Sequence, residues 1–237
     1  MKLQLILNDI HTFYGTSHIL FGIDLKVHSG ECVCLLGRNG VGKTTTLKSI
    51  IGLTPPKLGR IEYNGKNIIG LAPYEIAKLG IGYVPDERII FPDLTVRENL
   101  EIAIKPSLTS DVEPWTIQKI FSLFPNLKEL ENNKGGYLSG GEQQMLTMGR
   151  TLMGNPLLLL LDEPVEGLAP VIVKQITEQI KYLKRLGLSI LFAEQNVQFA
   201  MEISDRAYVI EGGRVRFEGS MTELEKKPEI KEKYLMI

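Results

Sequence analysis

The sequence predicts an α/β fold in which a parallel sheet carries a phosphate-binding loop and a helical segment interrupts the sheet. Three observations predict it. An apolar run at 31–36 leads into a glycine-rich loop and then into a helical stretch at 43–51. A second apolar run, at 157–161, has no polar alternation, which is typical of a central parallel strand. Between residue 86 and about residue 150, strand patterns give way to three helical patterns.

The remaining elements follow from local patterns. Residues 3–26 alternate apolar and polar around a Tyr-Gly turn, which predicts two early strands. A strand leading into a turn is expected at 61–66. Further along the chain we expect a helix at 73–78, a strand at 81–84, helices at 95–104, 113–123 and 142–153, a helix at 171–186, a strand at 189–193, a helix at 197–203, strands at 206–211 and 214–218, and a charged helical tail from 221.

The length of 237 residues permits one compact domain with a subdomain inserted into it. We therefore expect a single domain over 1–237, with an α/β core formed by 1–85 and 151–237. The stretch 86–150 is expected to be the helical insertion.

Composition excludes several classes of protein. The formal net charge of −1 does not indicate binding to nucleic acid or to a membrane surface. No apolar run reaches the roughly 18 residues that a membrane span needs, so any membrane process requires a partner.

Cys32 and Cys34 are expected to point to opposite faces of one strand and to pack in the core without pairing. Few cysteines and no secretory signal predict the cytoplasm.

The loop after the first apolar run matches the phosphate-binding pattern G-x-x-x-x-G-K-[ST]. Its glycines let successive backbone N–H groups surround phosphate oxygens at a helix N-terminus. Lys43 can reach the β- and γ-phosphates of a nucleotide, and the Thr44 hydroxyl can bind Mg²⁺. The alternative is a glycine-rich turn that matches by chance. The residues of the loop are Gly37, Arg38, Asn39, Gly40, Val41, Gly42, Lys43, Thr44 and Thr45.

Two acids end the apolar strand at 157–161. Acids at the carboxyl end of such a strand face the crevice where α/β sheets bind ligands. Asp162 is placed to hold Mg²⁺, directly or through water. Glu163 is the candidate that orients and polarises the attacking water, a role worth about 10²–10⁴ in rate. Because strands often end in acids, this Asp-Glu pair is a strong indication of a nucleotide site only together with the phosphate-binding loop.

The segment 138–144 reads LSGGEQQ. One interpretation is a capping box, with Ser139 as the N-cap and Glu142 three residues later. That geometry does not explain the two glycines, Gly140 and Gly141, which allow another group to approach the backbone closely. Between a phosphate-binding loop and a leucine-rich strand ending in Asp-Glu, this segment resembles the signature of ABC-transporter ATPases.

The resemblance covers nearly the whole chain and is to one subfamily, the second of the two ATP-binding subunits of branched-chain amino-acid importers. It implies a P-loop NTPase (RecA-like) core, an antiparallel β subdomain and an inserted α-helical subdomain that carries the signature. The segments that resemble this subfamily are VPDER at 84–88, FP at 91–92, LTVRENL at 94–100, GLAP at 167–170, AEQN at 193–196 and YL at 234–235.

The resemblance also implies an assembly. Two ATPase subunits, this chain paired with itself or with a sibling, stack head to tail with two ATPs between them. Ser139, Gly140 and Gly141 then touch the ATP on the partner's P-loop, and Tyr14 stacks on adenine, although a surface tyrosine beside a turn is the alternative. Integral membrane permease subunits hold the pair at the cytoplasmic face of the membrane. A periplasmic or extracellular solute-binding protein takes part indirectly, and ATP with Mg²⁺ is the nucleotide.

Three positions depart from the broader superfamily pattern. Asp86 stands where a glutamine is usual, Gln195 where a switch histidine is usual, and Ala169 near where an aspartate is usual. Asp86 can still bind Mg²⁺-bound water. Gln195 can form hydrogen bonds but cannot titrate near neutral pH as histidine does. We expect the ATP site on this P-loop to turn over more slowly than one on a subunit that carries the histidine.

The helical insertion has two interpretations. It either caps the core, or it also forms a groove for a cytoplasmic helix of a membrane subunit. The candidate groove residues are Phe91, Leu94, Val96 and Leu100.

The function expected from these observations is ATP hydrolysis that energises solute import. One alternative is a soluble ABC ATPase of translation or DNA repair, but such proteins usually carry two cassettes or a long coiled coil. Another is a regulatory module that binds nucleotide without turnover, against which Glu163 argues. A kinase or GTPase would share the P-loop but would not need LSGGEQ.

Overall fold

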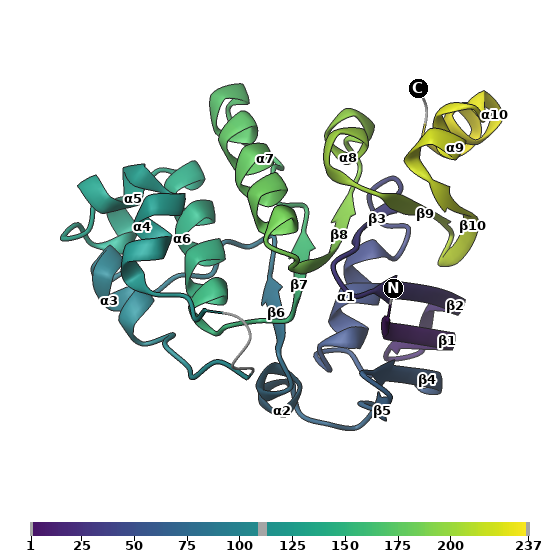
Figure 1. Cartoon of the computed structure of the whole chain (residues 1–237). Coiled ribbons are helices and arrows are strands. Elements are labelled where there is room, and N and C mark those ends of the chain that lie inside the picture. The colour runs from purple at the N-terminus through teal and green to yellow at the C-terminus, as the bar shows by residue number, and fades with distance from the viewer. Residues whose placement is uncertain (1, 109–112, 236–237) are drawn as a thin grey trace.

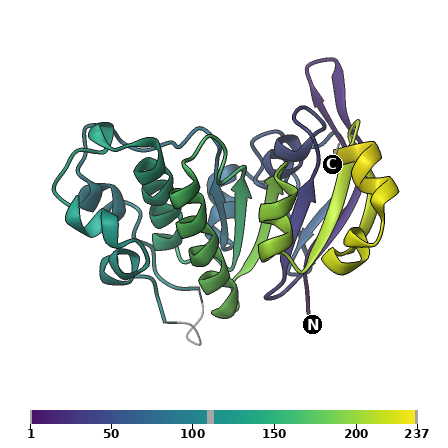
Figure 2. The same cartoon turned by 90° about the horizontal axis from the view of Figure 1, so that it is seen from above.

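The computed structural model describes residues 2–108 and 113–235, and it folds them into two sheets with helices between and around them (Figures 1 and 2). Residues 1 and 236–237 of the expected domain, and residues 109–112 of the expected insertion, lie outside the described part.

The larger sheet has six strands in the order β10-β9-β3-β8-β7-β6. Five of them run parallel, and β10 is an antiparallel edge strand. Every residue of β3 and β7 is buried, as the lack of polar alternation predicted. The carboxyl ends of the parallel strands therefore meet at one edge. The strands are β3 (Cys32–Leu36), β6 (Ile81–Val84), β7 (Leu158–Asp162), β8 (Ser189–Glu194), β9 (Arg206–Glu211) and β10 (Arg214–Ser220).

The smaller sheet is antiparallel and has the order β2-β1-β4-β5. Helix α1 (Lys43–Ile50) lies between the two sheets, because Leu47 and Ile50 share one buried cluster with side chains from both. Figure 1 shows this sheet to the right of α1. The predicted α/β fold with an antiparallel part is confirmed. The strands are β1 (Leu3–Tyr14), β2 (Ser17–His28), β4 (Leu58–Tyr63) and β5 (Lys66–Asn67).

The other face of the large sheet is covered by α6 (Gly140–Met153), α7 (Pro170–Arg185) and α8 (Val197–Ile203). Both cysteines are free and buried, as expected. The prediction that they point to opposite faces was wrong. Cys32 and Cys34 belong to the cluster on the α7 side, because residues two apart in a strand share a face.

The described residues between β6 and β7 are helical where they are regular (Figure 1, left). The helix expected at 113–123 begins at Ile117, where Thr116 caps it by accepting the N–H of Lys119. The helix expected at 142–153 begins at Gly140, because Ser139 is its N-cap. The elements are α3 (Val96–Glu101), α4 (Ile117–Leu123), α5 (Pro125–Glu129), a 3₁₀ turn (Gly135–Tyr137) and α6.

Two of the candidate groove residues lie in the core. Val96 and Leu100 are completely buried against α4 and α6, so the groove interpretation was wrong for them. Phe91 is exposed, with the Arg150 guanidinium 4.5 Å above its ring, and Leu94 is partly buried.

The remaining helices are short. Helix α2 (Pro73–Lys78) precedes β6. The charged tail is helical as expected but broken into α9 (Met221–Glu225), α10 (Pro228–Ile230) and a π-helical turn (Lys231–Leu235), which lie beside β9 and β10 (Figure 2). Among the described residues, no helix has the length and apolar character that a membrane crossing requires.

Candidate functional site

The loop between β3 and α1 is shaped by its glycines. Gly42 has φ 110°, a left-handed conformation that favours glycine, and a Cβ there would lie 2.7 Å from Leu20 Cδ2. A Cβ on Gly37 would lie 2.5 Å from the carbonyl oxygen of Ile210. The N-cap of α1 is Gly42, and no side chain caps the first N–H groups of this helix.

Lys43, the first residue of α1, is 3% exposed and held by several oxygens. Its Nζ donates to the carbonyl oxygens of Gly37 at 3.0 Å and Arg38 at 2.9 Å. It also lies 3.1 Å from Glu163 Oε1. The sequence-predicted phosphate-binding lysine and catalytic acid therefore form a buried ion pair.

Asp162 ends β7 and is completely buried. Thr44 Oγ1 donates to its Oδ1 at 2.9 Å, and the hydroxyl of Tyr83 donates to its Oδ2 at 3.0 Å. Burial raises the pKa of Asp162, while these two hydrogen bonds lower it. The structure thus joins two of the three residues predicted to hold Mg²⁺, Thr44 and Asp162, in one hydrogen bond.

Glu163 follows directly, with φ 42°, a left-handed conformation that is uncommon outside glycine. Its N–H donates to the carbonyl of Ala193 on the neighbouring strand β8. The Glu166 carboxyl is hydrogen-bonded to Glu163, and this contact with a like-charged group raises the pKa of Glu166.

Asp86 lies beyond the end of β6, close to a second acid. Burial, followed by its hydrogen bond to Glu87 and the charge of that residue, raises the pKa of Asp86 to about 6. Glu87 is held in turn by Lys48 on α1, at 3.6 Å between Nζ and Oε1.

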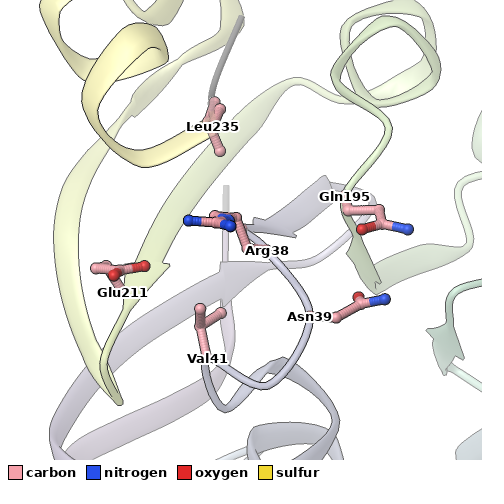
Figure 3. Close-up of a pocket in the computed structure, with 7 residues that line it drawn as sticks. Arg38, Asn39, Val41, Gln195, Glu211 and Leu235 are labelled. Carbon is pink, nitrogen blue, oxygen red and sulfur yellow. The ribbon is translucent and has the colours of Figure 1, made fainter.

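Two adjoining cavities, which share Asn39, bring most of the predicted residues together. The first, of about 350 Å³, is lined by Tyr14, Ile19, Asn39, Gly40, Gly42, Lys43, Thr44, Thr45, Asp86, Glu163 and Glu166. The second, of about 490 Å³, is lined by Gly37, Arg38, Asn39, Val41, Gln195, Glu211 and Leu235. Figure 3 shows Gln195 and Asn39 on one side of this second cavity and Glu211 on the other.

Tyr14 is 47% exposed, and its hydroxyl accepts a hydrogen bond from Thr54 at 3.4 Å. Its ring therefore has an accessible face at the wall of the first cavity.

The signature segment lines neither cavity. Ser139 and Glu142 form the expected capping box, with the Ser139 N–H and Oγ donating to Glu142 Oε2 at 2.7 and 2.8 Å. A Cβ on Gly140 would lie 2.5 Å from Arg88 Nη1, and one on Gly141 would lie 3.0 Å from Ile172 of α7. Arg88 Nη2 also donates to the carbonyl of Glu166, so this arginine connects the signature to the segment after Glu163.

Sequence reasoning missed three residues of this region: Tyr83, Arg88 and Glu194. A tyrosine in an otherwise apolar strand needs a partner for its hydroxyl, which was the available signal for Tyr83. Glu194 ends β8 beside the P-loop, and only its place at the end of an apolar strand hinted at a role.

A P-loop at the N-terminus of a helix, with an Asp-Glu pair delivered to it by a neighbouring parallel strand, defines a nucleoside-triphosphate-binding cassette. Comparison with known proteins agrees with this class. The family described as ABC transporter matches residues 20–166.

The chain is 40% identical to the high-affinity branched-chain amino acid transport ATP-binding protein BraG of Pseudomonas aeruginosa, over 98% of this chain and 99% of BraG. It is 42% identical to the probable branched-chain amino acid transport ATP-binding protein LivF of Archaeoglobus fulgidus, over 89% of each chain. A lipopolysaccharide export system ATP-binding protein, LptB of Haemophilus influenzae, is 35% identical over 94% of this chain and 92% of LptB.

A crystal structure of a nucleotide-free ATP-binding cassette from an ABC transporter has a TM-score of 0.82 to this chain at 27% identity, covering 99% of each. The chain belongs to the ABC transporter family, and it is an ABC ATPase.

Proposed function

We propose that this chain is the ATP-hydrolysing subunit of an importer for branched-chain amino acids. The buried cluster of Lys43, Thr44, Asp162 and Glu163 beside the P-loop supports hydrolysis. The cargo rests on the higher identity to BraG and LivF, which are named for branched-chain amino acids, than to LptB.

Each group has a role that its position supports. The P-loop N–H groups and Lys43 bind the phosphates, and Tyr14 stacks on the base. Glu163 orients the attacking water, and Gln195 donates a hydrogen bond near the γ-phosphate. Catalysis is then mostly positioning and charge stabilisation.

The residues present fit Mg²⁺. Thr44 and Asp162 supply a hydroxyl and a carboxylate, the hard oxygen ligands that Mg²⁺ uses together with substrate phosphates. When bound, Mg²⁺ would neutralise charge on the phosphates; Thr44 and Asp162 would hold it, with Asp86 acting through water.

We assign the signature residues Ser139, Gly140 and Gly141 to the ATP of a partner ATPase subunit. The assignment is supported by the linings of both P-loop cavities, which among the described residues do not include these three. The partner is a second copy or a sibling subunit.

The division of the chain into a core (1–85 and 151–237) and a signature-bearing insertion (86–150) is part of the proposal. It is supported by β6 and β7, which pair in one sheet although the helices α3 to α6 separate them in sequence.

We further propose that permease subunits hold the chain at the cytoplasmic face of the membrane and that a periplasmic or extracellular solute-binding protein feeds them. Phe91 and Ile89 are exposed beside the helices, where they can meet a permease.

Deletion of the encoding gene tests the cargo. The expected result is loss of leucine, isoleucine and valine uptake, restored by the parent gene and not by the Glu163→Gln variant. Uptake of lysine serves as the control. Normal branched-chain uptake with impaired lipopolysaccharide export would contradict the proposal and favour the LptB function.

A further inference from the structure

The carboxyl of Glu194, the residue directly before Gln195, is buried, and only one of its two oxygens has hydrogen-bond partners. Glu194 is 2% exposed. Its Oε1 accepts the backbone N–H groups of Gln195 at 2.7 Å and Asn196 at 2.9 Å. Its Oε2 is buried and has no hydrogen-bond partner among the described residues. Buried carboxylate oxygens are normally satisfied, because an unpaired one is costly. The free oxygen therefore requires an explanation.

Glu194 is joined to the nucleotide site by its backbone. It pairs with Leu36 at the end of β3, and its carbonyl oxygen accepts the N–H of Gly37, the first residue of the P-loop, at 3.2 Å. Through its Oε1 it also fixes the start of the segment that carries Gln195. The carboxyl thus lies between the P-loop and the Gln195 segment.

Three titratable groups interact with this carboxyl, each from a different element. They are Lys43 on α1, Glu163 after β7 and Cys34 on β3. Lys43 pairs with Glu163, so its positive charge is shared between Glu163 and Glu194. The Cys34 thiol is buried and its pKa is raised, so it remains uncharged. Glu194 consequently lies in a low-dielectric region together with the Glu163 carboxylate, and it has no cation that pairs with it alone.

We infer that Glu194 is a proton-linked group of the nucleotide site: its unpartnered Oε2 takes up a proton from solvent when ATP binds, so that the affinity for ATP falls as the pH rises. The inference rests on the proposed function, since it assumes that ATP occupies this P-loop. No covalent bond other than the new O–H is formed or broken.

Two effects of the bound nucleotide drive this uptake. Its phosphates add negative charge close to Glu194, and they draw the Lys43 ammonium toward themselves. Both disfavour the ionised carboxyl. The protonation equilibrium is already close to balance, because burial raises the pKa of Glu194 to about 7 against the opposing effect of the two backbone N–H donors. A further rise on binding therefore changes the charge of Glu194 near neutral pH.

The direction of the pH dependence follows from linkage. Below about pH 6 the carboxyl is protonated with or without nucleotide, so it adds no pH dependence. Above about pH 7 it must gain a proton on binding, and the dissociation constant rises by up to about tenfold per pH unit. ATP itself also titrates, so only the difference between the parent and a variant isolates Glu194.

Glu194→Gln is the decisive variant. Its amide oxygen can accept the same two N–H groups, while the side chain is neutral at every pH. We would titrate the full chain with the Mg²⁺ complex of the non-hydrolysable analogue AMP-PNP by calorimetry between pH 6 and 8.5, in two buffers of different ionisation enthalpy. Relative to the parent, the variant should take up fewer protons, up to about one per nucleotide at pH 8. It should bind equally at pH 6 and about five- to tenfold more tightly at pH 8.

Two further variants serve as controls, one for the loss of a negative charge and one for the retention of a titratable group. Glu178→Gln makes the same charge change at a carboxylate on the exposed face of α7 that lines neither cavity, and it should keep the parental proton uptake. Glu194→Asp retains a titratable group and should keep a pH dependence.

Equal proton uptake and equal pH slopes in the parent and Glu194→Gln would overturn the inference. Absence of AMP-PNP binding by the parent at every pH would instead overturn the proposed function, and the inference with it. The two failures are therefore distinguishable.

Discussion

Lys43 and Glu163 form a buried ion pair, with 3.1 Å between Nζ and Oε1 and side chains that are 3% and 9% exposed. The pair joins the start of α1 to the end of β7. A buried ammonium without partners is costly, so the carboxylate and the P-loop carbonyls stabilise Lys43 together. A nucleotide that binds to Lys43 must replace this interaction. Its phosphates therefore compete with the acid that the proposed reaction needs.

This competition gives the first prediction. Glu163→Gln should lower ATP hydrolysis about 10²–10⁴-fold, because the amide cannot act as a base toward water. Nucleotide binding should be retained or tightened, because Lys43 loses its anionic partner and has more charge for the phosphates. Phosphate release and ATP binding by the purified chain, over a wide range of protein concentration, measure the two effects.

The matched control is Glu178→Gln, which removes a carboxylate from the exposed face of α7. It should hydrolyse ATP at the parental rate. If Glu163→Gln hydrolyses ATP as fast as this control, Glu163 is not the catalytic acid-base group.

Tyr83 gives the second prediction. Its hydroxyl donates to Asp162 Oδ2, on the side of the carboxylate opposite to Thr44. Tyr83→Phe removes that donor and leaves Asp162 less firmly oriented. Groups that orient metal ligands typically account for about 10–100-fold in metal affinity or activity, so the Mg²⁺ concentration needed for half-maximal hydrolysis should rise by that order. Tyr137→Phe, at a residue that is 84% exposed, is the control. Identical Mg²⁺ dependence in both variants would refute this role.

Gln195 gives the third prediction. It lines the cavity beside the P-loop, where an amide can form hydrogen bonds but cannot carry a proton near neutral pH. Gln195→His should raise the steady-state turnover of a reconstituted ATPase pair several-fold. Gln195→Asn, which keeps the amide on a shorter side chain, should not. A histidine variant with the parental rate would mean that the departure from the superfamily pattern does not limit this site.

The local motifs of the site were predictable from the sequence. The phosphate-binding pattern at 37–45, with the apolar run before it, predicted a strand, a loop and a helix in that order. The apolar run before Asp162 predicted a buried strand that ends in the crevice. These inferences needed only neighbours in sequence. The core positions of the helices were predictable for the same reason, although α4 and α6 begin at caps that periodicity does not reveal.

Contacts between distant segments were not predictable. The hydrogen bond from Tyr83 to Asp162 exists because β6 lies next to β7 in the sheet, where Tyr83 pairs with Leu160. The long helical insertion separates these two strands in sequence, so local patterns do not indicate that they are neighbours. Val96 and Leu100 looked like interface residues, but whether an apolar helix face meets solvent or core depends on the helices packed against it. The burial of Glu194 likewise depends on β3 and β7 on either side of β8.

The fourth prediction concerns stability and again isolates Glu194. Its usual pKa is 4.5, and its pKa in the folded chain is about 7. Between these values the unfolded chain loses the proton and the folded chain keeps it, so the folded state binds more protons and the unfolding free energy falls as the pH rises. The contribution of Glu194 to the unfolding free energy is fully present below about pH 4.5, and its loss, on the order of 3 kcal/mol, is complete just above pH 7. Glu194→Gln should lack this fall. Urea unfolding of parent and variant from pH 5 to 8 should therefore show curves that diverge with rising pH, the variant becoming the more stable; parallel curves would show that the buried carboxyl does not titrate in this range.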